Sequence, residues 1–142
     1  MAQFAIGLLL FSIFIFLSAI HFYWGMGGKW GVNASIPTKE DGENVINPKP
    51  LDCFVVAIGL SVFATFVLVK TQLFSMALPV VILDYGISVI AGIFLLRAIG
   101  EFRYVGFFKK IKNTPFSQRD TKYYSPLCLL IGIMGILLEL LS

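Results

Sequence analysis

The amino-acid sequence predicts an all-α membrane protein, a single bundle of four transmembrane helices, on the evidence of composition and hydropathy. Of the 142 residues, 58% are hydrophobic and 13% are charged, whereas soluble domains average about 45–50% apolar and about 25% charged residues. Four apolar runs approach the roughly 20 residues that a helix needs to cross a bilayer. Because these runs are continuous and do not alternate with polar residues, they indicate helices and not barrel strands. They cover residues 4–24, 53–69, 76–96 and 124–141.

The first span ends in an unusual stretch, HFYWGMGGKWG at residues 21–31, which contains the only histidine of the chain. No basic region precedes this span and no A-x-A-like site follows it, so we expect it to be retained and not cleaved as a signal peptide. Four glycines in the stretch would allow a sharp turn or a close approach of the backbone to a ligand.

The loops differ strongly in charge. Ten of the eleven Lys and Arg lie in the first loop (27–51) and the third loop (97–123), and the second loop, near 70–75, is tight and holds only Lys70. The positive-inside rule therefore predicts that both long loops are cytoplasmic and that both termini lie outside. The first loop is polar and includes the glycosylation sequon Asn33-Ala34-Ser35, which would be silent on the cytoplasmic side.

Aromatic and basic residues interleave in the third loop, at Phe102–Tyr104 and Phe107–Lys112. This pattern is typical of a segment that lies in the membrane interface, with its rings among the headgroups and its cations against anionic lipids. We therefore expect anionic lipids as partners and no nucleic acid.

With this topology, three helix ends bring polar and aromatic side chains to one depth, and we predict a pocket there. His21 and Glu101 are the candidates for acid and base catalysis. Arg97 or Arg103 would hold an anionic group. The other candidate ligand-binding residues are Tyr23, Trp24, Lys29, Trp30, Tyr123, Tyr124 and Ser125. The alternative is an ordinary aromatic belt with a glycine turn, in which Arg97 and Glu101, spaced i, i+4, only pair with each other.

Two acids lie within predicted spans. Asp84 is about nine residues into the third span, where an ionisable group is costly and suggests function. It shares a face with Ser88 and Gly92, and Glu139 ends a stripe that contains Cys128, Gly132 and Gly135. If these faces pack together, the two carboxyls approach each other and suit proton-linked transport. Otherwise Asp84 is a protonated hydrogen-bonding group and Glu139 reaches the outer surface.

Other chemistries find little support in the sequence. The two cysteines form no C-x-x-C motif, and the chain contains no Walker loop, no G-x-S-x-G and no H-x-x-x-H. We expect no metal site, and the sequence leaves any cofactor unassigned.

Four stretches of the sequence resemble one known family: HFYWGMGGKWG, IPTKEDG, RAIGEFRYVGFFKK and TPFSQRDTKYYSPLCLLIG. The chain is similar, over nearly its whole length, to the domain of unknown function 3995 family. That resemblance implies a small bacterial inner-membrane protein with four spans, and it carries no established activity.

The leading functional hypothesis is the binding of an amphiphilic small molecule, such as a lipid, an isoprenoid or a quinone-like compound, in a polar and aromatic cavity near the cytoplasmic interface. Acid and base chemistry on that ligand is an extension of it. The alternatives are a proton-coupled transporter or exporter that uses Asp84, and an accessory or immunity-type protein without a ligand. An oligomer is compatible with each.

Overall fold

The computed structural model describes residues 1–142, apart from the side chains of residues 33 and 34, so the asparagine side chain that the sequon would modify lies outside the described part of the chain. The long helices are α1 (Ala2–Gly25), α3 (Pro50–Lys70) and α4 (Val80–Ile99). A fourth, Pro115–Leu141, consists of α5 (Pro115–Arg119), a π-helical turn η1 (Asp120–Tyr124) and α6 (Ser125–Leu141). All four are long and apolar enough to cross a membrane, which confirms the predicted four-helix membrane fold. A single helical turn, α2 (Val32–Ser35), lies in the first loop.

Prolines determine where two of the spans begin. Pro50 occupies the first turn of α3, where its missing N–H is not needed, and the Asp52 carboxylate accepts the Lys49 N–H at 2.8 Å. Pro79 is the N-cap of α4, so this span begins at Val80 and not at residue 76. A proline disfavours helical backbone in the residue before it. The second loop is therefore residues 71–79, longer than the tight loop that the sequence predicts.

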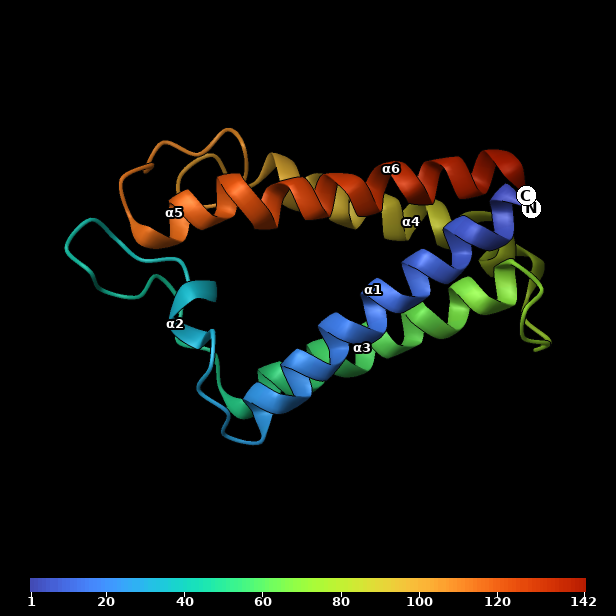
Figure 1. Cartoon of the computed structure of the whole chain (residues 1–142), viewed down its shortest axis with the longest axis horizontal. Helices are drawn as coiled ribbons and strands as arrows, with labels where there is room; N and C mark the ends of the chain where they lie inside the picture. The colour runs from blue at the N-terminus through green and yellow to red at the C-terminus, as the bar shows by residue number, and fades with distance from the viewer.

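The four spans form two antiparallel pairs, α1 with α3 and α4 with α6 (Figure 1). The pairs converge where the two chain termini lie, here called the terminal end, and diverge toward the first and third loops, here called the loop end. At the loop end α2 contacts α5, so the first loop reaches the third loop across the gap between the pairs.

The hydrophobic core occupies the terminal half of the bundle, where all four spans meet. Gly132 and Gly135 of α6 pack against α4, because a Cβ at Gly135 would lie 3.0 Å from the Cβ of Ala91 and one at Gly132 would lie 2.5 Å from the Leu95 side chain. Small residues allow such close helix contact in membranes. The glycine stripe of α6 does contact the third span, as predicted. The contacting residues of that span are Ala91 and Leu95 and not the predicted face of Asp84, Ser88 and Gly92. The most deeply buried core residues are Leu10, Phe14, Ala64, Val67, Ile87, Ile131 and Leu138.

Asp84 does not lie in a packed interface, and the predicted packing of its face is wrong. It is the fifth residue of α4, close to the helix start, and it is exposed together with Ser88. A Cβ at Gly92 would meet nothing within 4 Å. The register explains this exposure: Gly135 lies against Ala91, so Asp84 lies level with the end of α6 at Leu141.

Glu139 pairs with Lys70 and not with Asp84. Its Oε2 lies 3.3 Å from Lys70 Nζ, which also donates a hydrogen bond to the Leu83 carbonyl at 2.6 Å. The Lys70 side chain is 12% exposed and the Glu139 side chain 31% exposed. One cation therefore links α3, α4 and α6 at the terminal end, and Glu139 does not extend alone to the surface.

Candidate functional site

A cavity of about 1310 Å³ lies between the two helix pairs in the loop half of the molecule. All four spans and the first loop contribute to its wall. The part nearest the core is apolar and is formed by side chains of α1, α3, α4 and α6. These apolar lining residues are Phe16, Leu17, Leu60, Phe63, Ile93, Phe94, Leu127 and Ile131.

The polar lining residues of the cavity come from the loop end. Three are cations: Lys29, Arg97 and Arg119. No acid occurs among the described residues that line the cavity. Seven residues that the sequence singled out lie on this wall: His21, Trp24, Lys29, Trp30, Arg97, Tyr123 and Tyr124. Their role in binding stays a prediction, whereas their convergence on one cavity is observed.

The His21 ring has one nitrogen fixed by its own helix. Nδ1 lies 2.7 Å from the Leu17 carbonyl, and because a carbonyl can only accept, Nδ1 carries the hydrogen. Nε2 is then the nitrogen that can accept a proton or a hydrogen bond. The ring also meets Trp24 edge to face, with the centroids 5.0 Å apart.

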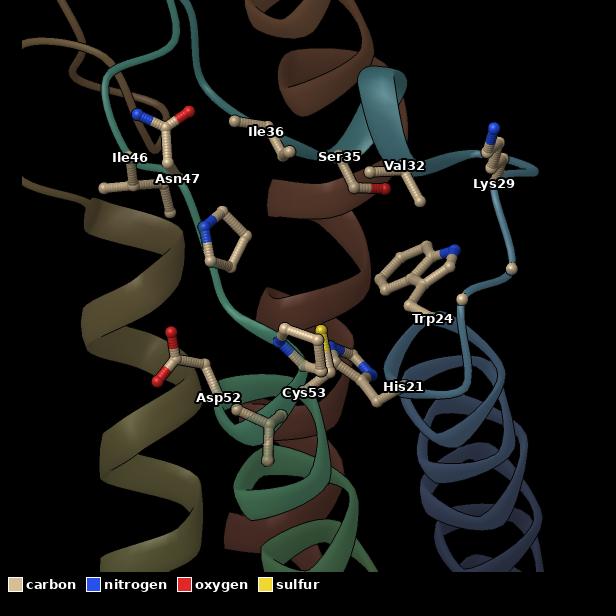
Figure 2. A pocket seen from close by; sticks show the side chains of 15 residues that line it. His21, Trp24, Lys29, Val32, Ser35, Ile36, Ile46, Asn47, Asp52 and Cys53 are labelled. Atoms are coloured by element: carbon tan, nitrogen blue, oxygen red, sulfur yellow. The ribbon is translucent and has the colours of Figure 1, made fainter.

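His21 also borders a second, smaller hollow of about 730 Å³ beneath the first loop. Figure 2 shows Asp52 and Cys53 on α3, His21 on α1, and Ile36 and Ile46 on the loop above them. Because Asp52 caps the start of α3, its carboxylate has a structural role. His21, Trp24, Lys29, Ser35 and Val56 line both hollows, which are therefore neighbours.

The glycine-rich stretch after α1 is a turn held by two aromatic side chains. Trp24 Nε1 donates to the Trp30 carbonyl at 2.7 Å, and the Trp30 N–H donates to the Tyr23 hydroxyl at 3.4 Å. A Cβ at Gly28 would collide with the Tyr23 ring, so a larger residue there would displace Tyr23 from this turn. Tyr23 is not among the lining residues of the cavity and has a structural role in this turn.

Arg97 is held by a buried ion cluster that sequence reasoning missed. Its Nη2 donates to Asp120 Oδ1 at 3.0 Å. Asp120 is fully buried, and its Oδ2 accepts the Gly106 N–H at 2.7 Å and lies 3.2 Å from Lys109 Nζ. Lys109, almost completely buried, also donates to the Gly106 carbonyl and to the Thr121 hydroxyl. Arg97 therefore pairs with Asp120, and the alternative of an Arg97–Glu101 pair is wrong.

Besides Tyr23, three other predicted site residues lie away from the cavity. Glu101 is exposed, and its carboxylate accepts the Tyr104 N–H at 2.5 Å. The Arg103 guanidinium lies over the Tyr104 ring, 5.1 Å from its centroid. Ser125 is fully buried in the first turn of α6, and its Oγ has no hydrogen-bond partner among the described residues. None of the three is among the residues lining the cavity.

The third loop is a compact irregular segment from residue 100 to residue 114, followed by α5. It is not an amphipathic helix, but it exposes the rings of Phe102, Phe107 and Phe108. Asp120 was missed because its position depends on this loop folding back onto the start of the fourth helix. The available signal was that only Glu101 and Asp120 are acidic in a loop of seven cations. In the described part of the chain no group of three or more His, Cys, Asp and Glu side chains converges as a metal site would require.

Neither the curated proteins nor the solved structures contain a significant match to this chain. A family model does match, over residues 14–135, and its description is "Protein of unknown function (DUF3995)". The matched region includes the cavity-lining parts of all four spans together with both long loops. The chain therefore belongs to the DUF3995 family of proteins of unknown function.

Proposed function

We propose that this protein binds an amphiphilic molecule in the cavity between its two helix pairs, with the tail toward the core and the head at the loop end. The observation that carries the proposal is the division of the cavity wall, apolar near the core and cationic and phenolic near the loops. Ligand sites in helical bundles are usually largely apolar, with a few polar groups that fix orientation. A cavity of about 1310 Å³ exceeds the roughly 300–1,000 Å³ of most small-molecule pockets, so it has room for a chain as well as a head.

The proposed orientation in the membrane agrees with this placement. The basic bias of the first and third loops favours a cytoplasmic loop end in a bacterial inner membrane, with both termini outside. The cavity mouth would then lie at the depth of the lipid headgroups. Exposed rings and cations of the third loop support contact with anionic lipids beside the mouth.

An enzymatic version of this function has one well-placed proton acceptor. His21 Nε2 is available, since Nδ1 is bound to the Leu17 carbonyl. Glu101, the proposed partner in acid and base chemistry, lies outside the cavity. A phenol such as Tyr123 is the more favourable second group, because it lines the cavity with His21.

The transporter alternative has less support, because Asp84 is exposed near the start of α4 and Glu139 is bound to Lys70. No contact in the described residues favours an accessory role without a ligand. Amphiphile binding is therefore the function that the geometry supports best.

Native mass spectrometry of the protein in a neutral detergent tests the proposal. We expect a copurified amphiphile that Gly59→Phe reduces, because Gly59 lines the cavity and its Cβ position is open. Gly92→Phe is the matched control, since Gly92 is also helical with an open Cβ position but is not a lining residue. Equal retention by both variants, or no retained amphiphile in the wild type, would contradict the proposed function.

A further inference from the structure

The charges around the cavity mouth select one class of head group. The mouth carries Lys29, Arg97 and Arg119, and its nearest buried acid, Asp120, binds two cations at once. Lys109 offsets the Asp120 charge, so that the Arg97 charge is available to a ligand. With Lys29 and Arg119 included, the mouth has an excess of three positive charges.

Arg97 is oriented by this cluster while keeping donors to spare. Nη2 is bound to Asp120, and Asp120 is fixed by the Gly106 N–H and by Lys109. The other terminal nitrogen, Nη1, is buried and has no hydrogen-bond partner in the part of the chain that the structure describes. A guanidinium has five N–H donors in a planar fork, and the Arg97 side chain is 33% exposed and lines the cavity. Its exposed part can therefore meet an anion while Nη2 holds Asp120.

We propose that the head group of the ligand is a phosphate monoester or diphosphate, bound by Arg97, Arg119 and Lys29, with Asp120 as the positioning residue for Arg97. This inference rests on the proposed function and names the ligand class of the same site. A phosphate monoester carries a charge of about −1.5 to −2 at neutral pH and three strong acceptor oxygens. It matches both the charge excess and the planar geometry of arginine better than a single carboxylate does.

The Tyr123 hydroxyl and His21 extend the same recognition surface, since both line the cavity. The phenol can donate a hydrogen bond to a phosphate oxygen, and His21 Nε2 can accept one from the P–OH of a singly protonated phosphate monoester. The apolar lining below them would hold the chain of the same molecule. A free phosphate could use the same cations, so the test must separate a soluble phosphate from a phosphate that carries a chain.

Intrinsic fluorescence provides the readout, because both tryptophans of the chain, Trp24 and Trp30, line the cavity. The purified protein in a neutral detergent is titrated with dodecyl phosphate, with dodecanol and with inorganic phosphate. We expect a saturable change in tryptophan fluorescence with dodecyl phosphate. Dodecanol and inorganic phosphate should bind at least about tenfold more weakly, because the first lacks the charged head and the second lacks the apolar chain.

The exposed cations carry the mutational test, since neither is part of the buried cluster. Arg119→Gln and Lys29→Gln should each weaken dodecyl phosphate binding by about tenfold, the effect of losing one charge-assisted hydrogen bond. Arg103→Gln is the matched control, because Arg103 lies in the third loop but outside the cavity lining, and it should bind as the wild type does. Arg97→Gln should bind most weakly if it folds, and Arg97→Lys should recover part of the binding.

The outcomes separate this inference from the proposed function. Two results would contradict a phosphate head group while leaving amphiphile binding intact. One is that dodecanol binds as tightly as dodecyl phosphate, and the other is that Arg119→Gln and Lys29→Gln both bind dodecyl phosphate as the wild type does. Saturation by inorganic phosphate alone at the same concentrations would support the phosphate site and contradict the amphiphile. No response to any of the three probes would overturn both.

Discussion

The backbones of Gly100 and Gly106 are in direct contact where α4 ends, and a Cβ at Gly106 would lie 2.5 Å from the Gly100 Cα. Both have left-handed backbone, with φ of 86° and 92°. A Cβ at Gly100 would in turn collide with the Val105 carbonyl. This contact closes the loop that presents the Gly106 N–H to Asp120, so the glycines help to orient Arg97.

Gly100→Ala and Gly106→Ala should therefore each lower the free energy of unfolding by on the order of 2 kcal/mol or more, because strain at positive φ adds to the collision. Thermal unfolding in detergent measures this loss. Gly92→Ala provides the control, since a Cβ there meets nothing within 4 Å and lies within a helix, and it should be neutral or stabilising by up to about 1 kcal/mol. Unchanged stability of both loop variants would show that the third loop is not closed in this way.

Asp120→Asn should be among the most destabilising single changes. The side chains of Asp120 and Lys109 are 0% and 1% exposed, and removing one charge of a buried pair costs about 3–5 kcal/mol. Adding Lys109→Met should recover part of the loss, because the uncompensated cation is then gone. Asp41→Asn in the exposed first loop is the control and should change the free energy of unfolding by less than about 0.5 kcal/mol. A double variant as unstable as the single one would argue against the ion cluster.

Glu139→Gln and Asp84→Asn should differ in stability although both neutralise an acid near the terminal end. Glu139→Gln leaves Lys70, which is 12% exposed, without its carboxylate and should cost about 1–3 kcal/mol. Asp84 is exposed, so Asp84→Asn should change the free energy of unfolding by less than about 0.5 kcal/mol. Unfolding temperatures of the two variants, measured side by side, decide this, and a larger loss for Asp84→Asn would indicate that the Asp84 face has a packing partner.

Accessibility labelling tests the orientation in the membrane. After Cys53 and Cys128 are replaced by alanine, single cysteines at the exposed positions Glu40, Gln72, Asn113 and Ser142 probe the loops and the C-terminus. A membrane-impermeant maleimide added to intact cells should label positions 72 and 142 only, since the positive-inside rule predicts that the two basic loops are cytoplasmic. Labelling at 40 or 113 would reverse the orientation and place the cavity mouth outside.

The sequence was sufficient to predict the four spans because each is an uninterrupted apolar run. In a bilayer core the backbone N–H and C=O groups of such a run must pair with each other, which a helix achieves. The order of the spans alone predicted that four side chains gather near one depth, those of His21, Arg97, Tyr123 and Tyr124. Asp84 was misplaced for two reasons that a linear pattern does not show. Pro79 delays the start of α4, and the register of Ala91 against Gly135 leaves Asp84 level with the end of α6.

Arg97 illustrates a second limit of sequence reasoning. At i, i+4 spacing Glu101 is the natural local partner for an arginine on a helix, but α4 ends at Ile99, before Glu101 is reached. The observed partner, Asp120, is 23 residues away and becomes adjacent only because the third loop folds back. Long-range pairing of this kind depends on loop geometry, and the two glycines at positive φ that create it resemble ordinary turn residues in the sequence.

The division of the bundle into two antiparallel pairs has a consequence for biosynthesis. Each pair is contiguous in the chain, α1 with α3 and α4 with α6, so each hairpin can assemble as soon as its second helix leaves the ribosome. The first hairpin is complete once residue 70 has left the ribosome, before any residue of the second pair has done so. The cavity between the pairs, by contrast, cannot form until α6 has been inserted, and any ligand must therefore enter after all four spans are in the membrane.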